Sequence, residues 1–335
     1  MTASTGRRDD LDQAKGLAIL LVVFGHLAAR EAPIGVDWYE PLRQAVYLFH
    51  MPFFLYLSGL AAALSGAATL PPSGWRALAR RRAARLLLPF LGFGLLILAG
   101  KLALAPHVYV DNVPENLFAG LDGLLRATGA SPAASVWYLL AVFAFALATP
   151  LLWRLGGGVA LISVALALFT WPAPALFYLD RLAGYFVFFA AGVLAGQAGA
   201  GWTAALDRHG LAFRTLFLTA LAVAAGCGAT HADKLALLLV GLAAMPALHG
   251  MVRAWPSEAL LWLGRHSLPI YLLNTICIGL AKAALLPVLG WRAASFPLFA
   301  PLLMAAGIGG PVLLAAIWAR AGGWFPARPA SAGSR

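Results

Sequence analysis

A lysine and a histidine stand at the two ends of an otherwise apolar run, KGLAILLVVFGH, residues 15–26. An α-helix turns by about 100° per residue, so the steps from Lys15 to His26 bring both side chains to one face, about 16 Å apart along the axis. That distance rules out a direct hydrogen bond, and Asp12 shares the same face. The pattern therefore indicates two separate positions on one helical face. The ammonium group of Lys15 could bind a negative charge, and the imidazole of His26 could exchange a proton.

A second histidine, His50, lies in the next apolar stretch, AVYLFHMPFFLYLSG. It is expected about 9 Å inside the outer end of that helix, and a short connection places it at a depth similar to that of His26. Ionisable groups inside membrane segments are costly and usually functional, although packing against a serine or a carbonyl is the alternative. We expect His26 and His50 to be catalytic, because a proton taken from a hydroxyl would let its oxygen attack an activated acyl group.

Arginines crowd the start of the third apolar segment, in RALARRRAAR. A cytoplasmic anchor that binds anionic lipid explains such a cluster. Arg82 and Arg85 are three residues apart, so they are expected on one helical face, and guanidinium groups suit phosphate. We therefore expect Lys15, Arg82 and Arg85 to bind a phosphorylated donor, with the lipid anchor as the alternative.

Two further pairs of residues are candidates for substrate binding. Trp137 and Tyr138, in SVWYLLAVF, come near the outer end of the fourth apolar segment, where a sugar could stack on them or an aromatic belt could explain them. Tyr271 and Asn274 are three residues apart in GRHSLPIYLLNTICIGLAK and share a helical face. Hydrogen bonding between helices is the alternative role of the second pair.

The elements that must position these residues are membrane helices. Of the 335 residues, 61% are hydrophobic and 11% are charged, whereas about 25% of the residues of an ordinary soluble domain are charged. The apolar segments have the length of spanning helices and lack the short alternating pattern of a membrane barrel. We predict an all-α polytopic membrane protein with about ten transmembrane helices, at residues 14–29, 44–65, 83–104, 134–153, 157–172, 182–199, 211–228, 234–252, 262–287 and 296–319.

The distribution of lysine and arginine predicts that both termini are cytoplasmic, because the connections on the side of the N-terminus hold most of these residues. We expect a cytoplasmic segment at residues 1–13, a single transmembrane domain at residues 14–319 and a disordered cytoplasmic tail at residues 320–335. The long outer connections, residues 30–43 and 105–133, are expected to cover an outer site.

Several other functions are disfavoured. The net charge of +11 comes from arginines in short loops and not from a separate basic domain, so we expect no nucleic-acid partner. Cys227 and Cys277 both lie in apolar stretches and predict neither a disulfide nor a metal site. No nucleophile elbow, HExxH motif or phosphate-binding loop is present in the sequence.

Five stretches, in family order, resemble the acyltransferase-3 family of bacterial integral membrane O-acyltransferases, in its stand-alone, fucose 4-O-acetylase-like form. They are DDLDQAKGLAILLVVFGH, FHMPFFLYLSG, RRRAARLLLPF, SVWYLLAVFAFALATPL and GRHSLPIYLLNTICIGLAK. The resemblance implies that His26 is the critical catalytic residue and that Lys15, Arg82 and Arg85 support it. Many members have arginine where Lys15 stands and histidine where Asn274 stands, and the second departure puts a catalytic role for Asn274 in doubt.

The resemblance implies a bacterial inner-membrane O-acyltransferase. It would move an acyl group, usually acetyl, from cytoplasmic acyl-CoA to a hydroxyl of a cell-envelope or exported carbohydrate. Its partners would be acyl-CoA (acetyl-CoA in most members), the carbohydrate acceptor and the lipid bilayer, with no tightly bound cofactor. The alternative is a proton-coupled exporter of a sugar or lipid-linked precursor, whose histidines relay protons. The arginines expected beside Lys15, and the lack of a visible inverted repeat, favour the acyltransferase.

Overall fold

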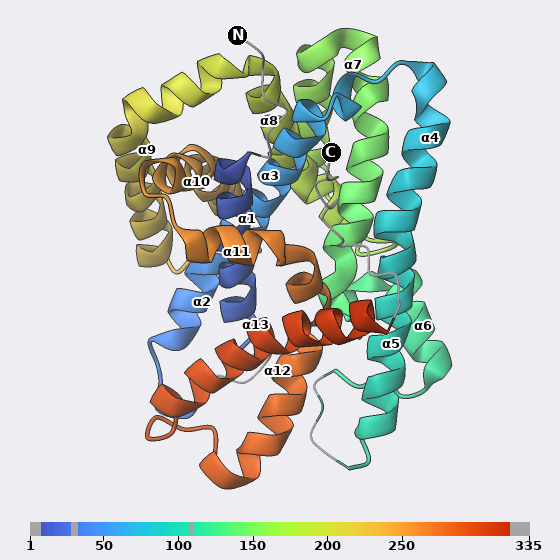
Figure 1. Ribbon diagram of the computed structural model, residues 1–335, viewed down its shortest axis with the longest axis vertical. Helices are drawn as coiled ribbons and strands as arrows, with labels where there is room; N and C mark the ends of the chain where they lie inside the picture. Colours follow the sequence, from blue (N-terminus) through green and yellow to red (C-terminus); the bar gives the residue numbers. More distant parts are fainter. Residues whose placement is uncertain (1–7, 28–32, 108–109, 111, 322–335) are drawn as a thin grey trace.

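The computed structural model describes residues 8–27, 33–107, 110 and 112–321. Regular structure in these ranges is helical, and the described residues form no strand beyond one isolated bridge between Ile34 and Arg292. Figure 1 shows the helices α1 (Asp9–Gly25), α2 (Tyr39–Tyr47), α3 (His50–Leu64), α4 (Pro72–Arg82), α5 (Leu88–Leu104), α6 (Leu117–Leu125), α7 (Trp137–Thr170), α8 (Leu179–Ala198), α9 (Ala200–Gly226), α10 (Lys234–Ala254), α11 (Glu258–Arg265), α12 (Ser267–Leu289) and α13 (Phe296–Arg320). The fold class is thus all-α, as the sequence predicts.

Eight helical stretches of the described residues are long and apolar enough to cross a membrane. They are Tyr39–Leu64, Pro72–Leu104, Ala134–Thr170, Leu179–Ala198, Ala200–Gly226, Lys234–Ala254, Ser267–Leu289 and Phe296–Arg320. The difference from the predicted ten has two sources. The predicted segment 14–29 corresponds to α1, which has only 17 residues and begins with acidic residues, and the predicted segments 134–153 and 157–172 both fall in α7.

Helix α7 is broken in its middle, so its two halves lie side by side. Gly156 and Gly157 have non-helical backbone angles, and Gly157 has a φ of 60°, which favours glycine. The green ribbon in Figure 1 doubles back at this point. Both ends of α7 therefore meet α8, where Trp137 packs on Tyr185 and Phe169 packs on Phe188. The sequence prediction of two apolar segments with a break between them matches this shape.

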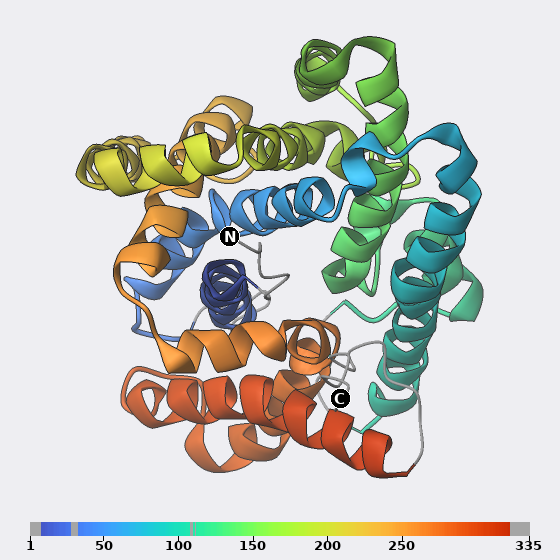
Figure 2. The same cartoon turned by 45° about the horizontal axis from the view of Figure 1, so that its top comes forward.

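Helix α1 lies in the middle of the molecule. Figure 2 shows this dark blue helix end-on, with α3 on one side and the orange and red helices α11, α12 and α13 on the other. Its residues Ala14, Ala18, Ile19 and Val23 are fully buried. The apolar run that begins at Lys15 is therefore packed against other helices of the protein.

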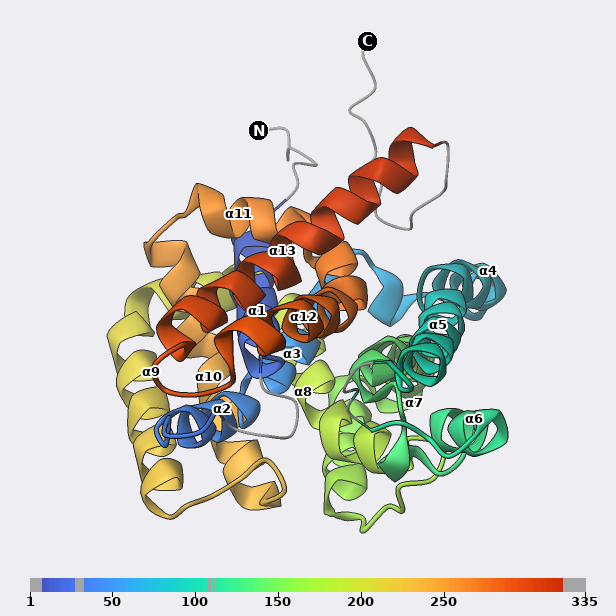
Figure 3. The same cartoon turned by 90° about the horizontal axis from the view of Figure 1, so that it is seen from below.

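Glycines allow two close helix crossings. A Cβ atom at Gly16 would collide with a carbonyl oxygen of α11, and one at Gly264 would collide with a carbonyl oxygen of α1. The same reciprocal pattern joins α3 and α8 at Gly59 and Gly192. Small residues of this kind let membrane helices approach closely. Figure 3 views the bundle from below and shows α1 enclosed beside α3.

The ends of the predicted domain differ in detail from the structure. Helix α1 begins at Asp9, inside the predicted cytoplasmic segment 1–13, and α13 ends at Arg320. Most of the predicted tail, residues 322–335, lies outside the described residues. The predicted outer connections, residues 30–43 and 105–133, contain parts or all of helices α2 and α6.

Candidate functional site

Two tyrosines hold the end of α1, where His26 follows the last helical residue. The Tyr47 hydroxyl donates to the carbonyl oxygen of Gly25 at 2.7 Å, and the Tyr39 hydroxyl donates to that of Phe24 at 3.0 Å. Helix ends leave such carbonyls without an intrahelical partner. A Cβ atom at Gly25 would lie 2.6 Å from the Tyr47 ring, so this approach requires glycine. His26 is half-buried beside this contact.

His50 is linked to His26, although its place in its own helix differs from the prediction. The predicted segment 44–65 is interrupted at Leu48 and Phe49, so His50 is the first residue of α3. The prediction that it lies about six residues inside a helix is therefore wrong. Pro52 follows in the first turn, where the missing N–H of proline costs nothing. Tyr47 links the two histidines, because its hydroxyl binds the carbonyl of Gly25, next to His26, and its ring lies 4.9 Å from that of His50.

The hydrogen bond of His50 fixes which of its nitrogens carries the proton. Its Nδ1 lies 2.9 Å from the carbonyl oxygen of Val46. A carbonyl can only accept, so Nδ1 must donate. In the neutral imidazole the other nitrogen, Nε2, then has a free lone pair, which is the form that a general base requires.

A third histidine, His231, joins this end of the bundle from the connection between α9 and α10. Its ring meets the Tyr47 ring edge to face at 5.6 Å, and the Tyr47 ring lies 4.9 Å from that of His50. His231 is half-buried and contacts Gln44 of α2. Sequence reasoning missed His231, because only long-range packing brings this connection to α2.

Lys15 lies on α1 towards the opposite end from His26. Its Nζ is 3.4 Å from Oδ1 of Asp12, and the Lys15 side chain is 29% exposed, whereas that of Asp12 is 7% exposed. The Asp12 carboxylate thus keeps the ammonium group at the edge of the buried face of α1.

Arg82 is the last residue of α4, and Arg85 lies inside the π-helical turn Ala83–Leu87 that follows it. Such a turn is wider than an α-helical one. Arg82 is half-buried and Arg85 is exposed, so the two guanidinium groups differ in their access to solvent. Among the residues that the structure describes, no carboxylate forms an ion pair with either guanidinium group. Arg82 lies within electrostatic range of Tyr138, whereas Lys15 lies against Asp12, so the three cations have different surroundings.

Tyr138 and Tyr271 are brought together from α7 and α12. Their ring centroids are 5.2 Å apart, and the Phe54 ring lies 4.8 Å from that of Tyr138. The Tyr138 hydroxyl is 2.5 Å from Oγ of Ser58, and the Tyr271 hydroxyl donates to the carbonyl oxygen of Ser135. Ser58 was not singled out in the sequence, because a lone serine in an apolar helix carries no signal of its own.

Trp137 and Asn274 lie outside this aromatic contact. Trp137 is buried against Tyr185 of α8, with the guanidinium group of Arg181 5.6 Å from its ring. Asn274 is 1% exposed and its Nδ2 donates to two carbonyl oxygens of its own helix, those of Ile270 and Tyr271, both at 2.8 Å. Its Oδ1 is buried and has no hydrogen-bond partner among the described residues.

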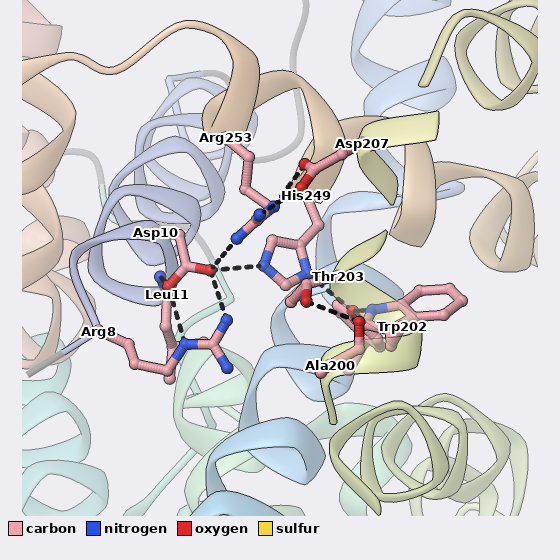
Figure 4. Close-up of polar contacts among 10 residues, drawn as sticks. Arg8, Asp10, Leu11, Ala200, Trp202, Thr203, Asp207, His249 and Arg253 are labelled. Atoms are coloured by element: carbon pink, nitrogen blue, oxygen red, sulfur yellow. Dashed lines mark hydrogen bonds and ion pairs between the residues drawn. The ribbon is translucent and has the colours of Figure 1, made fainter. Parts of the chain in front are cut away.

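Figure 4 shows a polar network at the other end of α1 that sequence reasoning missed. Oδ2 of Asp10 accepts a hydrogen bond from Arg253 at 2.9 Å and lies 3.6 Å from Nε2 of His249. Nδ1 of His249 is 2.8 Å from the Tyr56 hydroxyl, which accepts a hydrogen bond from the Trp202 indole at 2.7 Å. The fully buried His249 thus links α1 to α10, α3 and α9.

Opposing effects act on the carboxyl group of Asp10. Burial raises its pKa, but the nearby His249 ring, the hydrogen bonds with Arg8 and the positive charge of Arg8 lower it by more, so the pKa lies well below the usual range. Asp10 is therefore ionised at neutral pH and is the anionic centre of the network. The network orients the start of α1 and so fixes the position of Lys15, one turn further along. The only sequence signal was the acidic start of the helix, which the helix dipole favours.

No group of three or more histidine, cysteine, aspartate or glutamate side chains is placed to hold a metal ion in the part of the chain that the structure describes. The described candidate residues are imidazoles at one end of α1, and cations near its other end and around the π-helical turn after α4.

Comparisons relate the chain to known proteins. A family model described as "Acyltransferase domain" matches residues 8–316. The nodulation protein NolL of Sinorhizobium fredii is 35% identical over 153 residues, which cover 45% of this chain and 38% of that protein. The nodulation protein NolL of Mesorhizobium japonicum is 41% identical over 92 residues, which cover 27% of this chain and 24% of that protein. The alignments thus span well under half of either relative, and no solved structure matches the chain.

Proposed function

Because the chain belongs to the acyltransferase-3 family of integral membrane acyltransferases, we propose that it is an O-acetyltransferase of the bacterial inner membrane. Its donor is acetyl-CoA from the cytoplasm, and its acceptor is a hydroxyl group of a cell-envelope or exported carbohydrate. The observation that carries the proposal is the link of His26 to His50 through Tyr47 at one end of a buried helix whose other end carries Lys15.

The histidines provide the base for the transfer. The His26 imidazole takes the proton of the acceptor hydroxyl, and the oxygen attacks the carbonyl carbon of the thioester. The carbon–sulfur bond then breaks, the new ester remains on the carbohydrate, and coenzyme A leaves as a thiolate that takes up a proton. His50 supports this step as a second base, because its hydrogen bond with Val46 keeps a lone pair on Nε2.

The cations bind the phosphate groups of the donor. Arg82 and Arg85 have no carboxylate partner among the described residues, so their guanidinium groups are free for an anion. Lys15 contributes a third positive charge near the start of α1. With the phosphate groups at these cations and the base at His26, the donor must extend along α1 so that its thioester reaches His26.

Aromatic rings provide walls for the reacting groups. Tyr138 and Tyr271 form one such wall on the side of Arg82, whereas Trp137 and Asn274 lie outside it and do not contact the substrate in this mechanism. The orientation that this mechanism needs has both termini and Lys15 on the cytoplasmic side, which the distribution of lysine and arginine favours.

The test is the acetyl content of the cell-envelope glycan in a strain that lacks this gene. We expect the wild-type chain to restore O-acetyl groups and His26→Ala to restore none, although the variant reaches the membrane in normal amount. His209→Ala, which removes an exposed histidine of α9, is the matched control and should restore acetylation fully. Normal acetylation by His26→Ala would remove this histidine from the mechanism.

A further inference from the structure

A chain of hydrogen bonds beside the two catalytic histidines has no role in the reaction described so far. It starts at Arg43, whose Nε and guanidinium NH2 donate to the two carboxylate oxygens of Glu40 at 2.7 and 2.6 Å. Nε2 of Gln44 donates to the same carboxylate at 2.6 Å, and Oε1 of Gln44 lies 3.2 Å from Nδ1 of His231. All four residues are partly exposed, with the Glu40 side chain 39% exposed, so they are accessible from outside the bundle.

The direction of every bond in this chain is fixed by chemistry. The ionised carboxylate of Glu40 only accepts, so Gln44 must present its amide nitrogen to it. The amide oxygen of Gln44 then faces His231 and can only accept, so Nδ1 of His231 must donate. This leaves Nε2 as the acceptor of the neutral His231 ring, the same arrangement that the Val46 carbonyl produces in His50.

The surroundings of His231 keep this ring neutral. Burial lowers its pKa, and the positive charges of Arg181 and Arg43 lower it further, whereas the negative charges of Asp233 and Glu40 act in the opposite direction. A neutral imidazole with a free lone pair accepts a hydrogen bond from a hydroxyl group.

The position of His231 indicates what that hydroxyl belongs to. The ring of Tyr47 lies between those of His231 and His50, and the guanidinium group of Arg43 covers the Tyr47 ring at 4.9 Å. Arg43 and Glu40 neutralise one another, so this wall offers aromatic surface and hydrogen bonds without net charge. Such a surface suits a neutral sugar ring better than an acidic one.

We propose that His231 binds a hydroxyl group of the acceptor sugar through Nε2, one that is not itself acetylated, and that Gln44 and Glu40 are positioning residues that hold His231 in this form. The inference rests on the proposed function and names a subsite of the same site. The acceptor is thereby specified as a neutral sugar with at least one further free hydroxyl besides the acetylated one.

The test measures acetyl transfer from labelled acetyl-CoA by the full-length protein in vesicles. The acceptors are methyl glycosides of the monosaccharides found in the host's envelope glycan, together with their monodeoxy analogues. We expect His231→Ala to raise the KM for the acceptor about tenfold, the value of one hydrogen bond, with the KM for acetyl-CoA unchanged. With the wild type, one deoxy analogue should have a KM about tenfold higher than that of the parent sugar. With His231→Ala the same analogue and the parent sugar should have equal KM values, because the variant and the analogue each remove the same hydrogen bond.

Two further variants separate binding from folding. His231→Gln keeps a hydrogen-bond acceptor and should restore part of the acceptor affinity, while Gln44→Leu should raise the acceptor KM by a smaller factor. His107→Ala, which removes an exposed histidine, should change neither KM. The inference would be overturned if His231→Ala left the KM for the acceptor unchanged. It would also be overturned if each deoxy analogue raised the KM by the same factor in the wild type and in His231→Ala. Either result would leave the proposed transferase activity intact. A wild-type protein that transfers no acetyl group to any acceptor would instead contradict the proposed function.

Discussion

At the residue scale, the partner of each histidine decides what the imidazole can do. His50 and His231 donate through Nδ1 to an oxygen that can only accept, and each therefore keeps a lone pair on Nε2. His249 instead lies between Asp10 and Tyr56 in a buried network. The sequence placed His26 at the end of the first helix, and the structure links that end to His50 through Tyr47, whose hydroxyl binds Gly25 and whose ring lies 4.9 Å from that of His50. Sequence spacing could not find His231 or His249, whose partners are far away in the sequence.

The arginines near the π-helical turn also differ in their surroundings, and this difference gives a prediction for binding of the acetyl-CoA donor. Arg82 is half-buried beside Tyr138, whereas the neighbouring Arg81 is exposed. We expect Arg82→Ala to raise the KM for acetyl-CoA at least tenfold, because a charge-assisted hydrogen bond to phosphate contributes about 1.5–3 kcal/mol. Arg82→Lys should recover part of the loss. The measurement is acetyl transfer at varied acetyl-CoA, with Arg81→Ala as the control. Equal effects of Arg81→Ala and Arg82→Ala would indicate a general loss of positive charge and would contradict a specific phosphate contact.

At the element scale, breaks in the helices place the site. The interruption at Leu48 and Phe49 turns α2 away from α3, so that Tyr47 can bond to the end of α1 while His50 begins the next helix. At the π-helical turn Ala83–Leu87, Arg82 is half-buried whereas Arg85 is exposed. Hydropathy cannot reveal either feature, because the residues on both sides of each break are apolar or amphipathic. The break in α7 was visible, since three consecutive glycines mark it.

The crossing of α3 and α8 provides a prediction for stability. A Cβ atom at Gly192 would collide with the backbone of α3, whereas one at Gly184 in the same helix would meet nothing within 4 Å. We expect Gly192→Ala to lower the free energy of unfolding by about 1–3 kcal/mol, the usual cost of overpacking. Gly184→Ala should leave it unchanged or slightly higher, because alanine is the better helix former. Thermal unfolding of the two purified variants in detergent measures the difference. Equal midpoints would mean that the helices do not approach this closely.

At the scale of the whole molecule, the central helix α1 connects a region with a lysine to a region with histidines. Large apolar side chains such as Leu96, Val159, Leu211 and Leu235 remain exposed on the outer helices, as lipid contact requires. Helix α1 is enclosed by the others, carries Lys15 towards one end and leads to His26 at the other. Composition and the length of the apolar segments predicted the membrane class and the all-α fold. They could not predict that the first helix is the enclosed one, since burial in protein and burial in lipid produce the same apolar pattern.

The central claim is tested most directly in inside-out membrane vesicles, where the cytoplasmic side faces the medium. Labelled acetyl-CoA is added outside, and the deacetylated envelope glycan of the host is enclosed within. Vesicles with the wild-type chain should transfer the label to the enclosed glycan, and vesicles with an equal amount of folded His26→Ala should transfer none. Transfer at the wild-type rate by His26→Ala, or movement of unmodified glycan across the membrane without any acetylation, would contradict the account.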